Sequence, residues 1–292
     1  MNPLIKVLLA RGPVTLDGAW GTQLQARGLQ LGEFPDLWNL IQPERVHDVA
    51  LAYVESGSQI ILTNTFGANR IRLQDHNAAD KVVEINVRGV EISRRAANGR
   101  ARVFGSMGPS GKLLLNGDVD LPTLRASFAE QAQALAQGGA DGLVIETMSD
   151  LEEAKQAVSA ARETGLPVVA CMVFDSGKEK DRTMMGHTPE QSARALTEAR
   201  ADVIGANCGQ GIAGFMSICK RLHAATDRPI WIKANAGLPT VLEGRAHYDT
   251  SPEQFAESVP GMVNAGASFI GGCCGTGPEF IRATLRAVKA CS

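Results

Sequence analysis

The sequence lacks the long apolar run that a membrane helix needs. No stretch of its 292 residues approaches the roughly 20 consecutive apolar residues of a spanning helix. The N-terminal segment is briefly apolar but has no small-residue cleavage pattern, so we expect it to form a first helix rather than a signal peptide. These absences predict a cytoplasmic protein that does not enter a membrane.

A strong imbalance of charge is also lacking. The formal net charge is −2, so the sequence presents no basic excess of the kind that binds nucleic acid or an anionic membrane. The 44% hydrophobic and 21% charged residues are ordinary for a globular protein. We find no linker, low-complexity segment or strong repeat, and therefore expect one domain over residues 1–292.

Cysteine is scarce, and the usual sequence patterns of metal sites are missing. None of the six cysteines forms a CxxC pair, and none of the five histidines sits in a ligand-like pair. Cys273 and Cys274 are instead adjacent within a glycine-rich stretch, and Cys208 lies in an Asn-Cys-Gly stretch. Neighbouring Cα atoms are too close for an unstrained disulfide. In a reducing compartment this clustering favours metal binding or catalysis over structural cross-linking.

Eight apolar runs rich in β-forming residues alternate with stretches that carry apolar residues at helical spacing. This alternation over one chain predicts an α/β fold, the (β/α)8 TIM barrel. A doubly wound open sheet is the alternative, but its GxGxxG fingerprint is absent after the first run. The expected strands are Val14–Ala19, Gln59–Phe66, Arg102–Met107, Gly142–Met148, Pro167–Phe174, Val203–Cys208, Ile230–Asn235 and Ser268–Cys273.

The barrel prediction gives the cysteines a common location. Cys208 ends the sixth expected strand, and Cys273 and Cys274 end the eighth, so all three lie on the face where barrel enzymes build their active sites. Three thiolates suit Zn²⁺ with a fourth position open to substrate. The alternative is that they are buried structural thiols. We do not expect the other three to be ligands: Cys171 lies inside an apolar strand, Cys219 in a helix and Cys291 at the C-terminal end.

Zinc held by three thiolates is a weak Lewis acid toward water but still lowers the pKa of an incoming thiol. Such a site favours attack by a substrate sulfur on an activated carbon over hydrolysis. Asp17 and Glu146, at the ends of the first and fourth strands, are then candidates to bind a substrate ammonium group, or alternatively an acid/base pair or solvated loop acids. Backbone N–H groups around Gly18 and Ala19 would bind the carboxylate. Together these groups predict a pocket for an amino acid that carries a thiol.

Two further features lie at the expected mouth of the barrel. Asn235 ends the seventh strand, between the cysteine-bearing strands, and is expected to contact the substrate or approach the metal as a neutral oxygen ligand. The Gly-Thr-Gly-Pro segment Gly275–Pro278 could cradle a phosphate at a helix N-terminus, which would make a barrel enzyme without zinc. No lysine or arginine lies in that segment, so we rank this alternative below the metal site.

Six short motifs resemble those of the zinc-dependent homocysteine S-methyltransferases, and the resemblance covers essentially the whole chain. The block at 271–276 with the upstream Asn-Cys-Gly is the most specific. The motifs are Leu16–Ala19, Asn64–Phe66, Glu146–Thr147, Ala206–Gly209, Asn235–Pro239 and Gly271–Thr276.

The resemblance implies an enzyme that methylates L-homocysteine to methionine on a (β/α)8 barrel. It implies a zinc ion on Cys208, Cys273 and Cys274, with the homocysteine amino group held by Asp17 and Glu146. The homocysteine-binding module of cobalamin-dependent methionine synthase and bacterial single-domain betaine–homocysteine methyltransferases look most similar.

The methyl donor stays open at this point. The resemblance allows betaine or another onium compound, or a methylated corrinoid protein supplied in trans. Thr147 stands where the animal betaine enzyme has a zinc-ligating tyrosine. A further alternative is an idle zinc module that docks a corrinoid partner.

Overall fold

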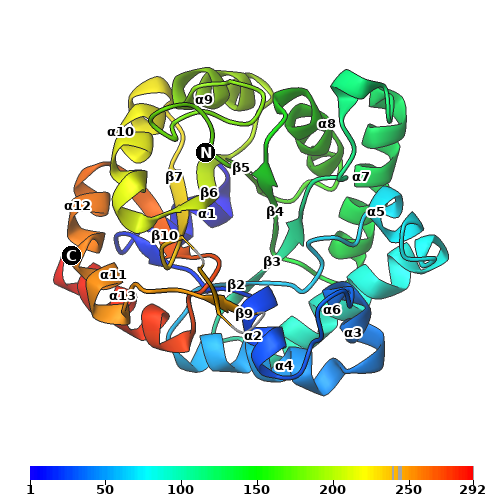
Figure 1. The fold of residues 1–292 in the computed structure, drawn as a ribbon, viewed down its shortest axis with the longest axis horizontal. Coiled ribbons are helices and arrows are strands. Elements are labelled where there is room, and N and C mark those ends of the chain that lie inside the picture. The colour runs from blue at the N-terminus through cyan, green and yellow to red at the C-terminus, as the bar shows by residue number, and fades with distance from the viewer. Residues whose placement is uncertain (239, 243–244, 292) are drawn as a thin grey trace.

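Eight parallel strands form a nearly closed barrel with helices between them, which confirms the predicted (β/α)8 fold (Figure 1). The computed structural model describes residues 1–238, 240–242 and 245–291, so Pro239 of the fifth motif lies outside the described residues. The strand order is β1-β10-β7-β6-β5-β4-β3-β2. The barrel strands are β1 (Val14–Thr15), β2 (Ile60–Leu62), β3 (Arg102–Met107), β4 (Gly142–Met148), β5 (Val168–Met172), β6 (Val203–Gly211), β7 (Ile230–Asn235) and β10 (Ala267–Gly272).

The outer helices begin where the sequence offers a cap or a proline. Thr188 and Ser251 each form a reciprocal capping box, and prolines occupy the first turn of several helices. Pro260 separates two short helices, α11 and α12, because proline lacks the N–H that the interior of one continuous helix would need. The helices are α4 (Pro43–Glu55), α6 (Val82–Ala97), α7 (Leu121–Gln137), α8 (Leu151–Arg162), α9 (Pro189–Glu198), α10 (Phe215–Ala225), α11 (Pro252–Glu257), α12 (Val259–Asn264) and α13 (Pro278–Ala290).

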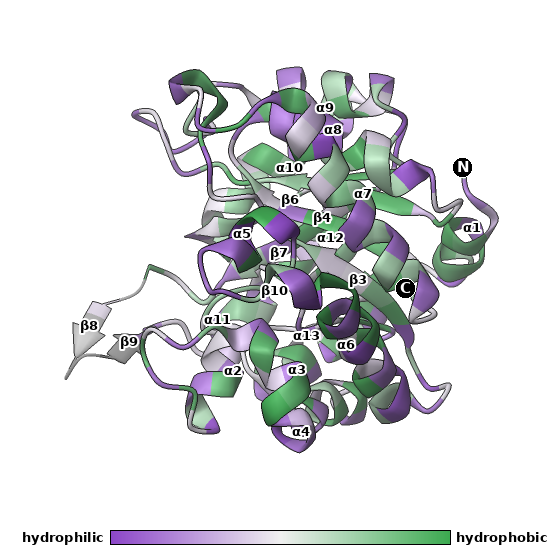
Figure 2. Cartoon of the chain, turned by 90° about the vertical axis from the view of Figure 1, so that its right-hand side faces the viewer, coloured by the Kyte–Doolittle hydropathy of each residue, from purple (hydrophilic) through white to green (hydrophobic). Residues whose placement is uncertain are grey.

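The loops that follow the strands carry short elements that the sequence analysis did not anticipate. A two-stranded antiparallel hairpin follows β7 and projects from one end of the barrel (Figure 2). No helix in the described part of the chain is both long and apolar enough to cross a bilayer. The added elements are α2 (Gly21–Ala26), η1 (Pro35–Leu37), α3 (Trp38–Ile41), α5 (Arg70–Gln74), η2 (Ala79–Lys81), η3 (Leu114–Asn116), η4 (Ile212–Gly214), β8 (Thr240–Leu242) and β9 (Arg245–His247).

The barrel interior is a packed apolar core. Trp231 of β7 stacks with Phe104 at 6.2 Å and lies 5.3 Å from Phe269, centroid to centroid. Helix α1 (Pro3–Leu9) lies at the opposite end of the barrel from the hairpin and contributes Ile5 to this core (Figure 2). These aromatic side chains belong to one buried cluster, so a site at the mouth of this barrel has an apolar floor.

One seam of the barrel is closed without a strand ladder. The Gln59 N–H donates to the Thr15 carbonyl at 2.8 Å, and the Thr15 N–H donates to Gln59 Oε1 at 2.9 Å. Further along, the Leu62 N–H donates to Asp17 Oδ2 at 2.8 Å. An aspartate side chain thus replaces a backbone acceptor between β1 and β2, which fixes Asp17 in the wall of the barrel.

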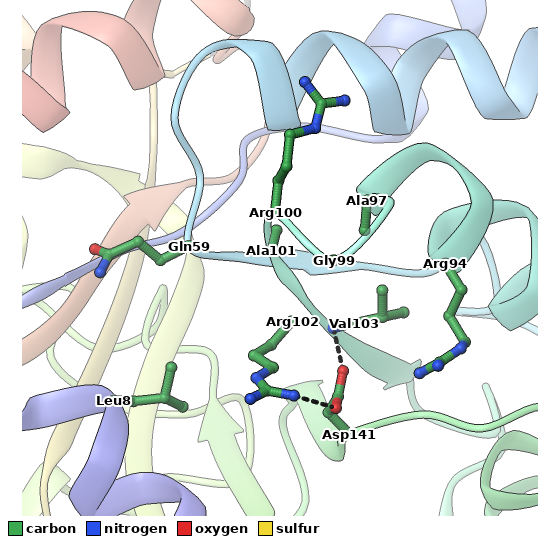
Figure 3. Close-up of a pocket in the computed structure, with 10 residues that line it drawn as sticks. All are labelled: Leu8, Gln59, Arg94, Ala97, Gly99, Arg100, Ala101, Arg102, Val103 and Asp141. Atoms are coloured by element: carbon green, nitrogen blue, oxygen red, sulfur yellow. Dashed lines mark hydrogen bonds and ion pairs between the residues drawn. The ribbon is translucent and has the colours of Figure 1, made fainter.

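A cavity of about 370 Å³ lies at the N-terminal ends of β2 to β4 (Figure 3). Arg102 and the Val103 N–H both bond to the Asp141 carboxylate, while the Arg94 and Arg100 side chains point in different directions (Figure 3). Arg94 donates to the Gly139 carbonyl at 2.7 Å. These side chains converge on no common point, and this end of a barrel is the one that serves stability.

Asp36, in the loop after β1, is a buried acid that supports the rim of the barrel mouth. Its Oδ1 accepts a hydrogen bond from the Gly67 N–H at 2.8 Å. Burial raises the pKa of Asp36 to about 7, against opposing hydrogen bonds and the Arg72 charge. The folded protein therefore keeps the Asp36 proton to a higher pH than the unfolded chain does, because an aspartate in an unfolded chain has a pKa of about 3.9.

The wild-type protein should become less stable as pH rises, because Asp36 must give up its proton while buried. We predict that Asp36→Asn does not show this decrease. Between about pH 4 and 7 the unfolded chain binds fewer protons than the folded protein, so the free energy of unfolding falls across this window. The stability of the variant relative to wild type should increase over it by on the order of 4 kcal/mol, at 1.36 kcal/mol per pKa unit. Urea unfolding at several pH values measures this, and an unchanged difference between pH 4 and 7 would contradict it.

Candidate active site

Three cysteine sulfurs meet at the C-terminal end of the barrel. The Sγ atoms of Cys208, Cys273 and Cys274 all lie within 4.8 Å of one another, and those of Cys208 and Cys274 are 3.9 Å apart. Sulfurs on a tetrahedral zinc ion, with Zn–S bonds of about 2.3 Å, lie roughly 3.8 Å apart. The spacing and the soft donor set therefore both fit one zinc ion.

The three cysteine thiols differ in the direction of their pKa shifts. Hydrogen bonds from Cys273 and Cys274 lower the pKa of Cys208, while their interaction with Cys208 raises the pKa of both partners. A cation at this point would instead favour the thiolate form of every ligand. The remaining cysteines lie elsewhere: Cys171 and Cys219 are buried, and Cys291 is exposed.

Two bulged strands shape the rim of this site. Thr147 in β4 and Cys208 in β6 both have a φ of 61°, and the strand register shifts at each position. Asn207 holds the two bulges together, because its Oδ1 accepts from the Thr147 N–H and its Nδ2 donates to Thr147 Oγ1, both at 2.7 Å. A left-handed threonine is strained, so these bonds maintain a conformation that the chain would otherwise avoid. The bulges re-aim residues at the barrel mouth.

Asp17, a predicted site residue, is fully buried and bonded by three donors. Lys233 Nζ lies 2.5 Å from Oδ1, while Trp20 Nε1 at 2.9 Å and the Leu62 N–H bond to Oδ2. Burial lowers the pKa of Lys233, but the carboxylates of Asp17 and Glu146 more than offset it, so the lysine stays charged. The sequence analysis missed Lys233. Its signal was a charged residue inside the apolar run of β7, two positions before Asn235 and so on the same face of the strand.

Glu146 faces the same interior from β4. Its Oε1 accepts a hydrogen bond from Ser106 Oγ at 2.5 Å, and Asn207 Nδ2 lies 3.5 Å from Oε2. Burial raises the pKa of Glu146, and the Lys233 ammonium and the Ser106 hydroxyl oppose that shift. One carboxylate oxygen thus keeps acceptor capacity for a substrate donor.

The backbone around Gly18 approaches the cysteine loop closely. A Cβ at Gly18 would lie 2.5 Å from the Thr276 carbonyl oxygen, so only glycine fits there. The Ala19 N–H already donates to Thr276 O at 2.9 Å. In the described part of the chain the Gly18 N–H donates to no protein acceptor.

Asn235 and Tyr248 flank the cysteines. Asn235 Oδ1 accepts from the Cys274 N–H at 3.0 Å, and a carbonyl oxygen has a second lone pair for another partner. The Tyr248 ring packs on Gly275, where a Cβ would lie 2.4 Å from the ring and where φ is +81°. Burial and the neighbouring Cys274 raise the pKa of the Tyr248 hydroxyl.

The segment proposed as a phosphate cradle is occupied by an acidic side chain. The Glu279 carboxylate lies against Gly277, where a Cβ would meet it at 2.4 Å. Thr276 Oγ1 donates to the Cys273 carbonyl at 2.7 Å and so ties the loop to the cysteines. A phosphate at this helix N-terminus would meet a like charge, which argues against the phosphate alternative.

A groove of about 900 Å³ opens beside Cys208, between the loops that follow β5, β6 and β7. Asp175 and Asp249 lie along it with Lys180, and the exposed Leu238 forms part of its wall. Gly209, the residue after Cys208, also lines the groove.

The sequence matches a family profile and larger curated proteins. The profile described as homocysteine S-methyltransferase matches residues 14–288. Methionine synthase of Mycobacterium leprae is 32% identical over 300 residues, which cover 97% of this chain and 25% of that protein. Methionine synthase of Mycobacterium tuberculosis is 33% identical over 291 residues, covering 93% and 24%. The chain thus spans about a quarter of the length of these relatives.

Solved structures with the same fold include the homocysteine methyltransferase MmuM from Escherichia coli. Its metallated form matches with a TM-score of 0.80 and 24% identity over 97% of this chain and 99% of that one. Its oxidized form matches with a TM-score of 0.80 and 25% identity over 98% and 99%.

Proposed function

Since this chain belongs to the homocysteine S-methyltransferase family, we propose that it transfers a methyl group to the thiol of L-homocysteine, giving methionine, with zinc held by Cys208, Cys273 and Cys274. The observation that carries the proposal is the convergence of the three sulfurs at the spacing of zinc ligands. Bound zinc would lower the pKa of the substrate thiol and keep its sulfur nucleophilic at neutral pH.

The polar groups around the cluster match the two charges of an amino acid. The free acceptor capacity of Glu146 suits an ammonium group, and the Gly18 N–H suits a carboxylate. Asp17 and Glu146 both interact with Lys233 at this end of the barrel, and Asn235 can contact the substrate or the metal through its second lone pair. The sulfur forms a bond to the methyl carbon as the carbon–donor bond breaks, and the bonding electrons leave with the donor.

The groove beside Cys208 provides a path for the methyl donor. The two carboxylates of Asp175 and Asp249 outnumber the one ammonium group of Lys180 and so favour a cationic group, which suits betaine or another onium compound. The groove is also open along one side, and a methylated corrinoid protein could present its methyl group there. The donor is one of these two classes.

A panel of donors tests the proposal. We expect homocysteine consumption and methionine formation with at least one of betaine, dimethylsulfoniopropionate, S-methylmethionine and a methylated corrinoid. Mass spectrometry with a labelled methyl group follows the transfer, and a zinc-free preparation is the control. A zinc-loaded protein that methylates homocysteine with none of these donors would instead fit the non-catalytic module that docks a corrinoid partner.

A further inference from the structure

Arg221, on α10, bonds to two carboxylates, one in the loop after β5 and one at the start of α9. Its Nη1 donates to Asp181 Oδ2 in that loop at 2.6 Å. Its Nε and Nη2 donate to the two oxygens of Glu190 at 2.6 and 2.9 Å, and these bonds lower the pKa of Glu190 to about 2. Such a planar fork fixes its partners in one geometry, so Arg221 ties the loop to two helices at once.

The same loop is held from the barrel side by Gln210 of β6. Gln210 Nε2 donates to the Phe174 carbonyl at 3.2 Å and to the Lys180 carbonyl. Lys180 has a φ of 53°, a backbone conformation that a lysine adopts only where its surroundings impose it. Gln210 lies two residues after Cys208 on the same strand, so it connects the loop to the strand that carries a cysteine of the cluster.

Elsewhere this loop is hydrogen-bonded to itself. The Ser176 N–H donates to the Arg182 carbonyl at 3.0 Å, and the Arg182 N–H donates to the Ser176 carbonyl at 3.1 Å. Among the described residues, the hydrogen bonds that join residues 175–187 to other elements come from Gln210 and Arg221. A surface loop with so few outside bonds opens easily when one of them is removed.

The loop forms one wall of the groove beside Cys208. Asp175 and Lys180 line that groove, and so does Gln210. Arg221 does not line it and bonds to the loop from α10. The charges that a ligand meets on this wall are therefore carried by a loop that Arg221 helps to hold in place.

We infer that Arg221 is a positioning residue that fixes the β5–α9 loop as a wall of the groove and so sets the affinity for the methyl donor. The inference rests on the proposed function, because that function places the donor in this groove. Arg221 acts through Asp181 and is not itself a donor contact.

Two variants release the loop by different routes. Asp181→Asn removes the loop carboxylate and leaves Arg221 paired with Glu190, while Arg221→Lys keeps the positive charge but lacks the fork that bonds to both acids. We expect each variant to raise the KM for the donor by about three- to tenfold. The KM for homocysteine and the zinc content should stay at their wild-type values, which a general loss of folding would not allow.

The donors used are betaine, dimethylsulfoniopropionate, S-methylmethionine and methylcobalamin, each at saturating homocysteine. Arg70→Lys is the matched control. Arg70 forms a similar fork with Glu130, at 2.6 and 2.5 Å, and neither residue lines the groove. Its donor KM should equal that of wild type. Asp181→Glu, which keeps the loop carboxylate, should recover most of the donor affinity lost in Asp181→Asn.

Hydrogen–deuterium exchange over residues 175–187 follows the loop without any donor. We expect faster exchange in Asp181→Asn and Arg221→Lys than in wild type and Arg70→Lys. Unchanged exchange would overturn the inference, and so would faster exchange with an unchanged donor KM, because the loop would then not form the donor site. A zinc-loaded wild-type protein that methylates homocysteine with none of the four donors would instead overturn the proposed function, whatever the exchange rates, so the two failures are distinguishable.

Discussion

Replacing Cys273 with alanine is expected to remove bound zinc and to abolish methyl transfer. Zinc strongly prefers four ligands, and the loss of one thiolate leaves two sulfurs with no other cysteine, histidine or carboxylate in the cluster among the described residues. Changes to outer partners of a metal site already cost about 10–100-fold, so the loss of a direct ligand should cost more than that in both affinity and turnover. Cys208→Ala and Cys274→Ala should behave in the same way.

Zinc content per chain, measured by elemental analysis after dialysis, checks this result alongside the rate of methionine formation. Cys291→Ala is the matched control, since that cysteine is exposed and lies outside the cluster. It should keep both zinc and activity. Full zinc and full turnover in Cys273→Ala would show that the metal site is wrongly assigned.

The fold and the cysteine cluster were predictable because both leave simple marks in the sequence. Eight apolar runs of strand length alternate with helical stretches, and such a pattern has few compact solutions. Cys208 ends the expected sixth strand and lies at the bulge of β6, while Cys273 directly follows β10, so both lie near the C-terminal ends of their strands. Parallel strands in a barrel bring their C-terminal ends to one face, so positions 65 residues apart in sequence can meet.

The detailed shape of the site was less predictable, because it depends on contacts between distant strands. Thr147 and Cys208 adopt left-handed backbone conformations although neither is a glycine, so the sequence did not indicate them. The hydrogen bond from the Thr147 N–H to Asn207, on the neighbouring bulge, explains how the threonine is held. The small helices and the hairpin after the strands have short, weakly periodic sequences. Lys233, by contrast, was readable: a lysine two positions before Asn235 in an apolar strand must face inward and find an acid.

Burial strengthens the effect of the charged side chains at the substrate site. Asp17, Glu146 and Lys233 lie above packed aromatic rings rather than in water, so their charges are poorly screened. A substrate that enters exchanges water for these fixed groups. Removing or adding a charge among these three side chains should therefore change substrate binding more than a similar change at the surface.

The second large effect is expected for Glu146→Gln, which should raise the KM for homocysteine by about 10–150-fold and leave kcat much less affected. The substitution keeps the shape and the acceptor for Ser106 but replaces a charge with an amide, which loses a charge-assisted hydrogen bond of roughly 1.5–3 kcal/mol. A change in KM with little change in kcat is the signature of lost uniform binding. The variant should also lose its preference for homocysteine over 4-sulfanylbutanoate, the analogue that lacks the amino group.

Glu153→Gln is the matched control for this prediction. Glu153, on α8, is also a buried glutamate, but its Oε1 accepts from the Ser110 N–H in the loop after β3, and neither residue belongs to the cysteine cluster. Its KM should therefore equal that of wild type even if its stability falls. Steady-state kinetics at saturating donor, with zinc content measured in each preparation, separate the two variants. Unchanged homocysteine kinetics in Glu146→Gln would exclude this carboxylate as an acceptor for the substrate ammonium group.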